Sequence, residues 1–169
     1  MNDLVQAELK KIFNGRFSTS KSTRANYARG EDTYDPILSK AVVFPETNEE
    51  VSKILSLCNE HKIPVVPFGT GTSLEGNVVG NEKGITISLE KMNKILSVNV
   101  GDFDCRVQAC VTKEQLNEYL REDGVFFPID PGADAAIGGM ASTSASGTMA
   151  VKYGTMKTVI TGLTVVLPN

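Results

Sequence analysis

The segment between residues 41 and 67 constrains the fold more than any other part of the chain. It opens with a short apolar run closed by proline, Ala41-Val42-Val43-Phe44-Pro45, and it ends with a second apolar run, Ile63-Pro64-Val65-Val66-Pro67. Between them, Thr47-Asn48-Glu49-Glu50 forms a capping box. In this motif the threonine hydroxyl accepts from the N3 amide, and the carboxylate of Glu50 accepts from the backbone amide of the N-cap residue. Apolar residues then recur at helical spacing. Strand, helix and strand in this order predict a βαβ unit, which favours parallel strands.

The rest of the sequence predicts further helices and mostly antiparallel strands. A helix is expected over residues 3–13, whereas residues 16–40 are polar and irregular and indicate an arm or long loop rather than a core element. The other predicted elements are strands over 84–89, 95–100, 106–111 and 158–167, and a helix capped by Thr112 and ended by Gly124. This order predicts an α+β fold of two lobes, a small βαβ lobe followed by a mostly antiparallel α+β lobe. We divide the chain into an N-terminal helix and arm, residues 1–40, and a main domain, residues 41–169.

Composition excludes several classes of function. Seventeen basic residues stand against 20 acidic ones, and no basic block interleaved with aromatic residues indicates nucleic-acid binding. No apolar run approaches the roughly 20 residues that span a bilayer. The N-terminus lacks the basic and apolar regions of a secretory signal. We therefore expect a cytoplasmic protein, with peripheral attachment to the inner face of a membrane left open.

Histidine and cysteine give little support for metal or nucleophilic chemistry. The three cysteines lack the number and spacing of a disulfide framework, and Cys105 and Cys110 are expected to be small core residues. The only histidine, His61, lies at the polar end of a predicted helix, where a charged imidazole favours the helix dipole. Since a zinc site needs about four clustered ligands, we predict no metal site.

The loop from Gly69 to Gly76 is the first feature that indicates a ligand. It follows an apolar strand and is rich in glycine, threonine and serine. Glycines allow positive φ angles and close approach to a ligand, and successive amides in such a turn can form an anion-binding nest. Amides and hydroxyls together suit a pyrophosphate. The alternative is a tight surface loop.

Two familiar phosphate-binding motifs do not fit this loop. Gly71 and Gly76 have the spacing of a P-loop, but Asn77-Val78 stands in place of the lysine and the hydroxyl residue. Gly69-Thr70-Gly71 begins a Rossmann fingerprint, but Leu74 stands at the third glycine position and no helix is expected to follow. A nucleoside triphosphatase and a Rossmann dinucleotide turn are therefore disfavoured.

A second stretch of small residues runs from Pro131 to Gly147. Small residues allow a chain to lie flat against a bulky group. The alternatives are a closely packed helix or a flexible linker, and the linker is disfavoured because Ile137, Met140 and Met149 interrupt the composition. Two such segments about 60 residues apart are suited to holding a long dinucleotide from two sides.

Four ordered motifs resemble the FAD-binding region of the vanillyl-alcohol-oxidase-type flavoproteins. They are Pro67-Phe68-Gly69-Thr70-Gly71-Thr72-Ser73-Leu74-Glu75-Gly76, Phe127-Pro128-Ile129-Asp130-Pro131-Gly132-Ala133-Asp134, Gly138-Gly139-Met140-Ala141 continuing to Ser146-Gly147-Thr148, and Lys152-Tyr153-Gly154-Thr155-Met156. Within that superfamily they are most similar to the cytochrome-linked D-lactate dehydrogenases and the glycolate oxidase FAD subunit. The resemblance covers the chain from about residue 25 to its end.

The resemblance implies an extended FAD between two α+β lobes. The first loop is expected to hold the pyrophosphate, and the second stretch, bordered by Tyr153, to line the ribityl and isoalloxazine side. The cofactor-binding residues so implied are Pro67, Phe68, Gly69, Thr70, Gly71, Thr72, Ser73, Pro131, Gly132, Ala133, Gly138, Gly139, Met140, Ser144, Ser146, Gly147 and Tyr153.

The sequence departs from the family pattern in two ways. Covalent members often carry a histidine in the first loop, whereas Thr72 stands at that place here, so non-covalent FAD is expected. Relatives also continue beyond the equivalent of Pro168 with the rest of the FAD domain and a substrate-cap domain. We therefore expect an N-terminal fragment, inactive alone, with no catalytic residue assignable in it.

The implied activity is oxidation of a small 2-hydroxy acid, D-lactate or glycolate, with electrons passing to an acceptor such as a quinone or a cytochrome. Two alternatives stay open: a flavin-binding module without activity of its own, and a sugar or alcohol oxidase on the same fold. Arg29 and Lys152 are interpreted as solvated surface charges. An exposed sheet edge invites pairing with a second copy, so a homo-oligomer is a further expectation.

Overall fold

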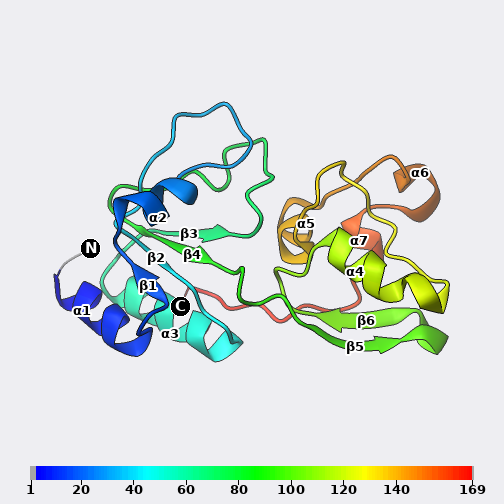
Figure 1. Ribbon diagram of the computed structural model, residues 1–169, viewed down its shortest axis with the longest axis horizontal. Helices are drawn as coiled ribbons and strands as arrows, with labels where there is room; N and C mark the ends of the chain where they lie inside the picture. Colours follow the sequence, from blue (N-terminus) through cyan, green and yellow to red (C-terminus); the bar gives the residue numbers. More distant parts are fainter. Residues whose placement is uncertain (1–2, 169) are drawn as a thin grey trace. The chain divides into compact units, whose positions relative to one another are not determined.

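A four-stranded sheet forms the centre of the first of two units into which the chain divides in the computed structural model (Figure 1). The structure describes residues 3–168, and this first unit comprises residues 3–91 and 164–168. Its elements are α1 (Asp3–Ile12), β1 (Phe17–Ser18), α2 (Lys21–Asn26), β2 (Ala41–Val43), α3 (Asn48–Glu60), β3 (Val65–Phe68) and β4 (Ile85–Ser88). The strand order is β1-β2-β4-β3, with β1 antiparallel to β2 and the other neighbours parallel.

The predicted βαβ unit is confirmed, with one feature that the pattern did not contain. Strands β2 and β3 run parallel and are joined by α3, but β4 lies between them and pairs with both. All four residues of β4 are buried, since a central strand is covered on both faces. Thr47 caps α3 by accepting from the amide of Glu50 at 3.2 Å, and His61 lies at the end of α3, as predicted.

Both faces of this sheet are covered. One face packs against α1 and α3 in a core formed by Val5, Leu9, Phe13, Ala41, Val43, Ile54, Cys58, Ile63, Ile85 and Ile87. Figure 1 shows these two helices on the same side of the strands and α2 on the other side. The second face buries Val42, Thr86 and Ser88. The Thr86 hydroxyl donates to the hydroxyl of Ser39 at 2.8 Å, which satisfies this buried polar pair.

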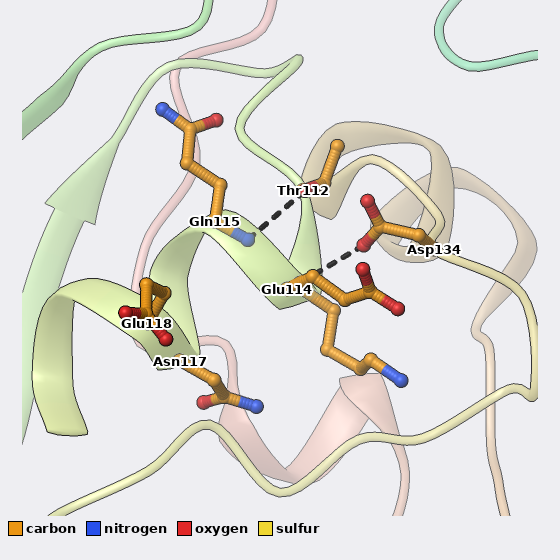
Figure 2. A pocket seen from close by; sticks show the side chains of 7 residues that line it. Thr112, Glu114, Gln115, Asn117, Glu118 and Asp134 are labelled. Carbon is orange, nitrogen blue, oxygen red and sulfur yellow. Dashed lines mark hydrogen bonds between the residues drawn. The ribbon is translucent and has the colours of Figure 1, made fainter.

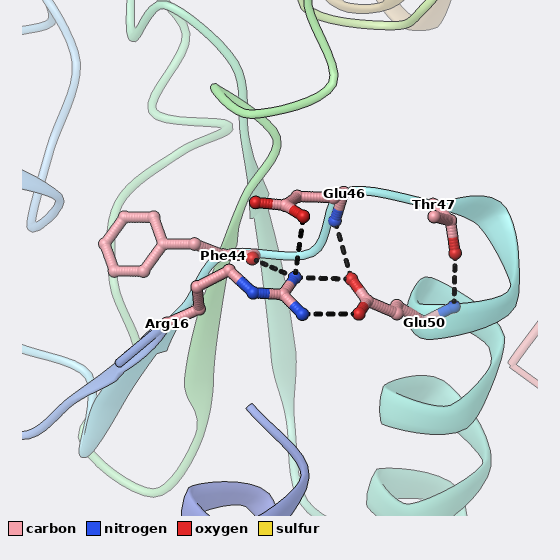
Figure 3. A network of polar contacts seen from close by, with 5 residues as sticks. All are labelled: Arg16, Phe44, Glu46, Thr47 and Glu50. Carbon is pink, nitrogen blue, oxygen red and sulfur yellow. Dashed lines mark hydrogen bonds and ion pairs between the residues drawn. The ribbon is translucent and has the colours of Figure 1, made fainter. Parts of the chain in front are cut away.

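An arginine joins β1 to the start of α3. The guanidinium of Arg16 makes a bidentate ion pair with Glu50, with N–O distances of 2.5 and 2.6 Å, and also donates to the carbonyl of Phe44 at 3.1 Å (Figure 3). The guanidinium, together with the amide hydrogen bond from Glu46, lowers the pKa of Glu50 to about 2. Charge-assisted bidentate pairs of this kind are stronger than neutral hydrogen bonds.

The second unit, residues 92–163, places helices on an antiparallel hairpin. Its elements are β5 (Ile95–Asn99), the 3-10 turn η1 (Val100–Asp102), β6 (Asp104–Val107), α4 (Lys113–Leu120), the 3-10 turn η2 (Arg121–Asp123), α5 (Ile137–Thr143), α6 (Ala150–Tyr153) and α7 (Met156–Val159). The apolar face of α4, with Leu116 and Leu120, packs against Ile95, Val98 and Val107 of the hairpin. The predicted cap by Thr112 and stop at Gly124 are both confirmed. The α+β fold class is therefore confirmed.

Three predictions made from the sequence are wrong, and the strand predicted over 106–111 lies earlier, at Asp104–Val107. Residues 16–40 contain β1 and α2 and bury Ala28 and Ser39, so they are not only an irregular arm. Residues 158–167 form no strand: α7 takes the beginning, and within the described chain no strand pairs with the remainder. Cys105 is exposed, because the face of β6 that carries it is not covered. The predicted division at residue 40 stays a prediction.

Candidate functional site

The first glycine loop begins at the carboxyl edge of the parallel strands. Phe44 follows β2, Phe68 ends β3 and Glu90 follows β4. Tyr27 contacts all three: its ring packs edge-on against Phe44 and Phe68, with centroid separations of 5.6 and 5.0 Å, and its hydroxyl donates to Glu90 at 2.5 Å. In open sheets of parallel strands this edge is where ligands usually bind.

The loop after Phe68 has the backbone conformation that its glycines predict. Gly71 has φ of 77°, and a Cβ added there would lie 2.7 Å from the Phe68 ring, so only glycine fits without displacement. The hydroxyls of Thr70 and Thr72 lie 3.4 Å apart, and Asn77 donates to the hydroxyl of Ser73 at 3.1 Å. Hydroxyls and amides therefore gather in one short turn.

Three successive amides in this turn have no acceptor within residues 3–168: those of Gly71, Thr72 and Ser73. Gly71 is buried and the other two residues are partly buried. Successive unpaired amides in a partly buried turn favour an anion that accepts from them. The residues present therefore fit a pyrophosphate group, and the binding of this group by the first loop stays a prediction.

The segment between α2 and β2 supports this loop, although no pattern in the sequence indicated it. A Cβ on Gly30 would lie 2.5 Å from the carbonyl oxygen of Gly71 and 2.9 Å from that of Ser73, so Gly30 lies directly against the loop backbone. The amide of Glu31 donates to the Gly71 carbonyl at 2.9 Å. The buried carboxylate of Asp32 accepts from the amide of Gly30 at 3.1 Å. The only sequence signal for this support is a glycine in a polar stretch.

In the second unit the small-residue stretch forms a closely packed helix over part of its length. Gly138 of α5 lies against Ala109, where a Cβ would be 2.8 Å from the alanine side chain. The side chain of Met140 is buried in the core of this unit. Gly139, by contrast, is exposed, and a Cβ there would meet nothing within 4 Å. The helix alternative considered for this stretch is thus the one observed for residues 137–143.

The residues around Asp130 form the other end of this stretch. Gly147 packs against the backbone of Asp130, next to Pro131 and Gly132, with Gly132 at φ of 88°. The carboxylate of Asp130 pairs with Lys113 at 2.8 Å, which lowers the pKa of Asp130 and raises that of Lys113. Most of the predicted contact residues of this unit thus lie at two places, around α5 and around Asp130.

The remaining predicted contact residues lie mainly on exposed turns. Pro67, Pro131, Ser144 and Ser146 are exposed, and Gly69 and Ala133 are partly buried. The ring of Tyr153 packs edge-on against Phe126 at 5.5 Å, and the ammonium of Lys152 lies 4.9 Å from the Tyr153 ring centroid. The two glycine-rich segments belong to different units. The assignment of these residues to the cofactor stays a prediction.

An open depression of about 710 Å³ at the start of α4 is a different feature (Figure 2). It is lined by Thr112, Lys113, Glu114, Gln115, Asn117, Glu118 and Asp134. Asp134 accepts from the amide of Glu114 at 2.9 Å, and Thr112 accepts from that of Gln115 at 3.1 Å. These two side chains cap the helix, and none of the predicted cofactor residues lines the depression.

Comparison with known proteins decides the family. A family model described as an FAD-binding domain matches residues 39–169. The chain belongs to this FAD-binding domain family. The predicted cofactor, FAD, is therefore confirmed.

Curated relatives of this FAD-binding domain include two groups of named enzymes. It is 45% identical over 152 residues to the probable mitochondrial D-lactate dehydrogenase of Danio rerio, covering 90% of this chain and 31% of that protein. It is 41% identical to the mitochondrial D-lactate dehydrogenase [cytochrome] of Arabidopsis thaliana, covering 96% and 29%. The match to glycolate oxidase subunit GlcD of Bacillus subtilis is 32% identical and covers 90% and 33%. The chain thus spans about a third of the length of these relatives.

Solved structures confirm the vanillyl-alcohol-oxidase-type fold. Alkyldihydroxyacetonephosphate synthase superposes with a TM-score of 0.90 over 99% of this FAD-binding domain and 35% of that chain, at 22% identity. p-Cresol methylhydroxylase superposes with a TM-score of 0.72 over 85% of this chain and 29% of that one, also at 22% identity. Likeness at this identity concerns the fold alone.

Proposed function

We propose that this chain is the cofactor-binding part of an FAD-dependent 2-hydroxy-acid dehydrogenase or oxidase that acts on D-lactate or glycolate. The observation that carries the proposal is its 45% identity over 152 residues to a probable D-lactate dehydrogenase, together with its 32% identity to a glycolate oxidase subunit. The unpaired amides of the first glycine loop are an independent structural support, because they fit the pyrophosphate of the family's cofactor.

In the proposed reaction the hydroxy acid becomes an oxo acid by losing a hydride from its α-carbon and the proton of its hydroxyl, and FAD, when bound, would supply the hydride acceptor. The role of the protein is to bind and orient the cofactor. The amides of Gly71, Thr72 and Ser73 donate to the phosphates. In the second unit the exposed positions, such as Gly139 and Ser146, contact the flavin side, while Gly138 and Met140 keep α5 packed.

Substrate and electron acceptor are proposed to bind elsewhere in the whole protein. The curated relatives are about three times as long as the region that matches. The chain contains one histidine, His61, which lies at the end of α3, away from the carboxyl edge of the sheet. We therefore expect this chain alone to bind FAD and to show no turnover of D-lactate or glycolate with a dye acceptor. A cytochrome or a quinone is the proposed acceptor.

The proposed location is the cytoplasm or the inner face of a membrane. Within residues 3–168 no helix combines the length and the apolar character needed to cross a bilayer. Attachment to a membrane surface is tested by sedimentation of the full-length protein with vesicles.

FAD titration of the purified chain, followed by calorimetry and by the flavin absorption spectrum, tests the proposal. Saturable one-to-one binding is the expected result. The full-length protein is then assayed with D-lactate, glycolate, sugars and simple alcohols. Turnover of a sugar or an alcohol, without turnover of a hydroxy acid, would replace the proposed substrate class.

Non-covalent attachment of FAD is the expected mode. Thr72 stands where covalent relatives of this fold often carry histidine, and a threonine hydroxyl is a poor nucleophile at its ordinary pKa. Acid precipitation of the FAD-loaded chain is expected to release all the flavin into the supernatant. Flavin that stays with the precipitated protein on a denaturing gel would contradict this expectation.

A further inference from the structure

The side chain of Arg24 has a buried donor without an acceptor. Its Nε atom is removed from solvent, and within residues 3–168 it has no hydrogen-bond partner. None of the ion pairs among the described residues involves Arg24. A buried donor left unpaired destabilises the fold, and more so when the group is charged. Such a group calls for an explanation, and a bound anion is one.

Arg24 lies on an element that reaches the first glycine loop. It is on α2, one helical turn before Tyr27, so the two residues share a face of the chain. Tyr27 contacts the residues at the carboxyl ends of all three parallel strands. Three residues further on, Gly30 lies against the carbonyls of Gly71 and Ser73. The segment from Tyr27 to Asp32 therefore lies along the same edge of the sheet as the loop, and Arg24 stands one helical turn before it.

The loop presents amides to an anion but no positive charge. Between Phe68 and Asn77 the side chains are aromatic, hydroxyl, apolar, carboxylate or amide, without lysine or arginine. The amide and hydroxyl donors of the loop supply only partial positive charges. A guanidinium supplies both a positive charge and a planar fork of donors that matches phosphate oxygens.

We propose that Arg24 is a phosphate-binding residue of the FAD site, one that donates from its guanidinium to the pyrophosphate held by the Gly71–Ser73 amides. The inference rests on the binding of FAD by this chain. It adds to the site a residue outside the family match, which begins at residue 39. The neighbouring Arg29 has an exposed side chain and lacks the buried donor that singles out Arg24.

The test compares four forms of the full chain: wild type, Arg24→Gln, Arg24→Lys and Arg121→Gln. Arg121 is the matched control, because its exposed side chain pairs with Glu118 on the surface of α4 and η2. FAD affinity is measured by flavin fluorescence, and inorganic pyrophosphate is used as a competitor. Circular dichroism verifies that each form is folded.

Arg24→Gln is expected to raise the Kd for FAD at least tenfold and to raise the inhibition constant of pyrophosphate in proportion. Arg24→Lys is expected to weaken both several-fold, because lysine keeps the charge but lacks the fork. Arg121→Gln is expected to match wild type. If Arg24→Gln does not fold, the Kd for FAD and the inhibition constant of pyrophosphate measured for Arg24→Lys test the proposal.

Two results would overturn the assignment of Arg24. One is wild-type affinity in the folded Arg24 variants. The other is an equal loss in Arg121→Gln, which would indicate a general charge effect. Failure of the wild-type chain itself to bind FAD is a separate result, because it removes the proposed function and with it this inference.

Discussion

At the scale of single residues, the glycines form two groups. At some, the missing side chain allows close contact with neighbouring atoms, and at others the surrounding space is open. Gly30 and Gly71 lie against the loop backbone and the Phe68 ring, whereas a Cβ added at Gly101 or Gly139 would meet no atom within 4 Å. Close approach therefore distinguishes glycines that the fold needs from glycines that other residues can replace.

Gly30→Ala is expected to weaken FAD binding about tenfold or more. The added Cβ would meet the carbonyls of Gly71 and Ser73 at 2.5 and 2.9 Å, so the loop and its unpaired amides must move. The change is measured as the Kd for FAD. Gly101→Ala is the control, because open space surrounds that position. Unchanged affinity in Gly30→Ala would show that the segment under the loop does not set its geometry.

The loop residues could be predicted from the sequence, whereas the residues beneath them could not. Gly69 to Ser73 stand out through composition and resemblance. Gly30 and Arg24 are single residues in a polar stretch, and the contacts of Gly30 are with residues more than 40 positions away. Local patterns do not contain such contacts.

At the scale of elements, the capped helices were the most predictable part of the chain. Thr47 and Thr112 are N-caps in the structure as in the sequence, because a capping box is a local arrangement of four residues. The strand order was harder to predict, because β4 lies between β2 and β3 and pairs with strands from which long stretches of sequence separate it. The run from residue 160 to 168 has the alternation of a strand, but alternation without a partner strand makes no ladder.

Glu50→Gln is expected to cost about 1–3 kcal/mol in the free energy of unfolding at pH 7, because it breaks a charge-assisted bidentate pair. The folded-state pKa of Glu50, about 2, lies below its ordinary value of 4.5. A lowered pKa means that this stability is present above pH 4.5 and is lost as the pH falls from there toward 2.

Urea unfolding of wild type and Glu50→Gln from pH 7 to pH 2 measures this effect. The difference between them should shrink as the solution is acidified. Glu118→Gln is the control, since both partners of the Glu118–Arg121 pair are about two-thirds exposed and such pairs contribute little. A difference that stays constant across this range would show that Glu50 does not stabilise the fold through its charge.

At the scale of the whole molecule, a run of alternating exposed apolar side chains lies near the C-terminal end of the described chain. Leu163, Val165 and Leu167 are 65%, 64% and 62% exposed. Apolar residues that alternate along an extended, unpaired backbone are prone to pair with another chain. Self-association is therefore the predicted behaviour of this chain at high concentration.

Val165→Lys is expected to shift the chain toward monomer, because a charge in the middle of an exposed apolar run opposes strand pairing. Light scattering over a range of concentrations measures the change. Thr164→Lys adds the same charge at the adjacent exposed position and is expected to have a smaller effect. A wild-type chain that stays monomeric at all concentrations would contradict the prediction of self-association.

The position of α1 has a practical consequence for work with this protein. Val5, Leu9 and Phe13 are fully buried in the same core as β2 and β4, yet the family match begins only at residue 39. The boundary of a sequence family and the boundary of a folding unit therefore do not coincide here. Anyone who excises the domain at residue 39 will expose one face of the sheet to water, and an insoluble product would reflect the cut rather than a missing cofactor.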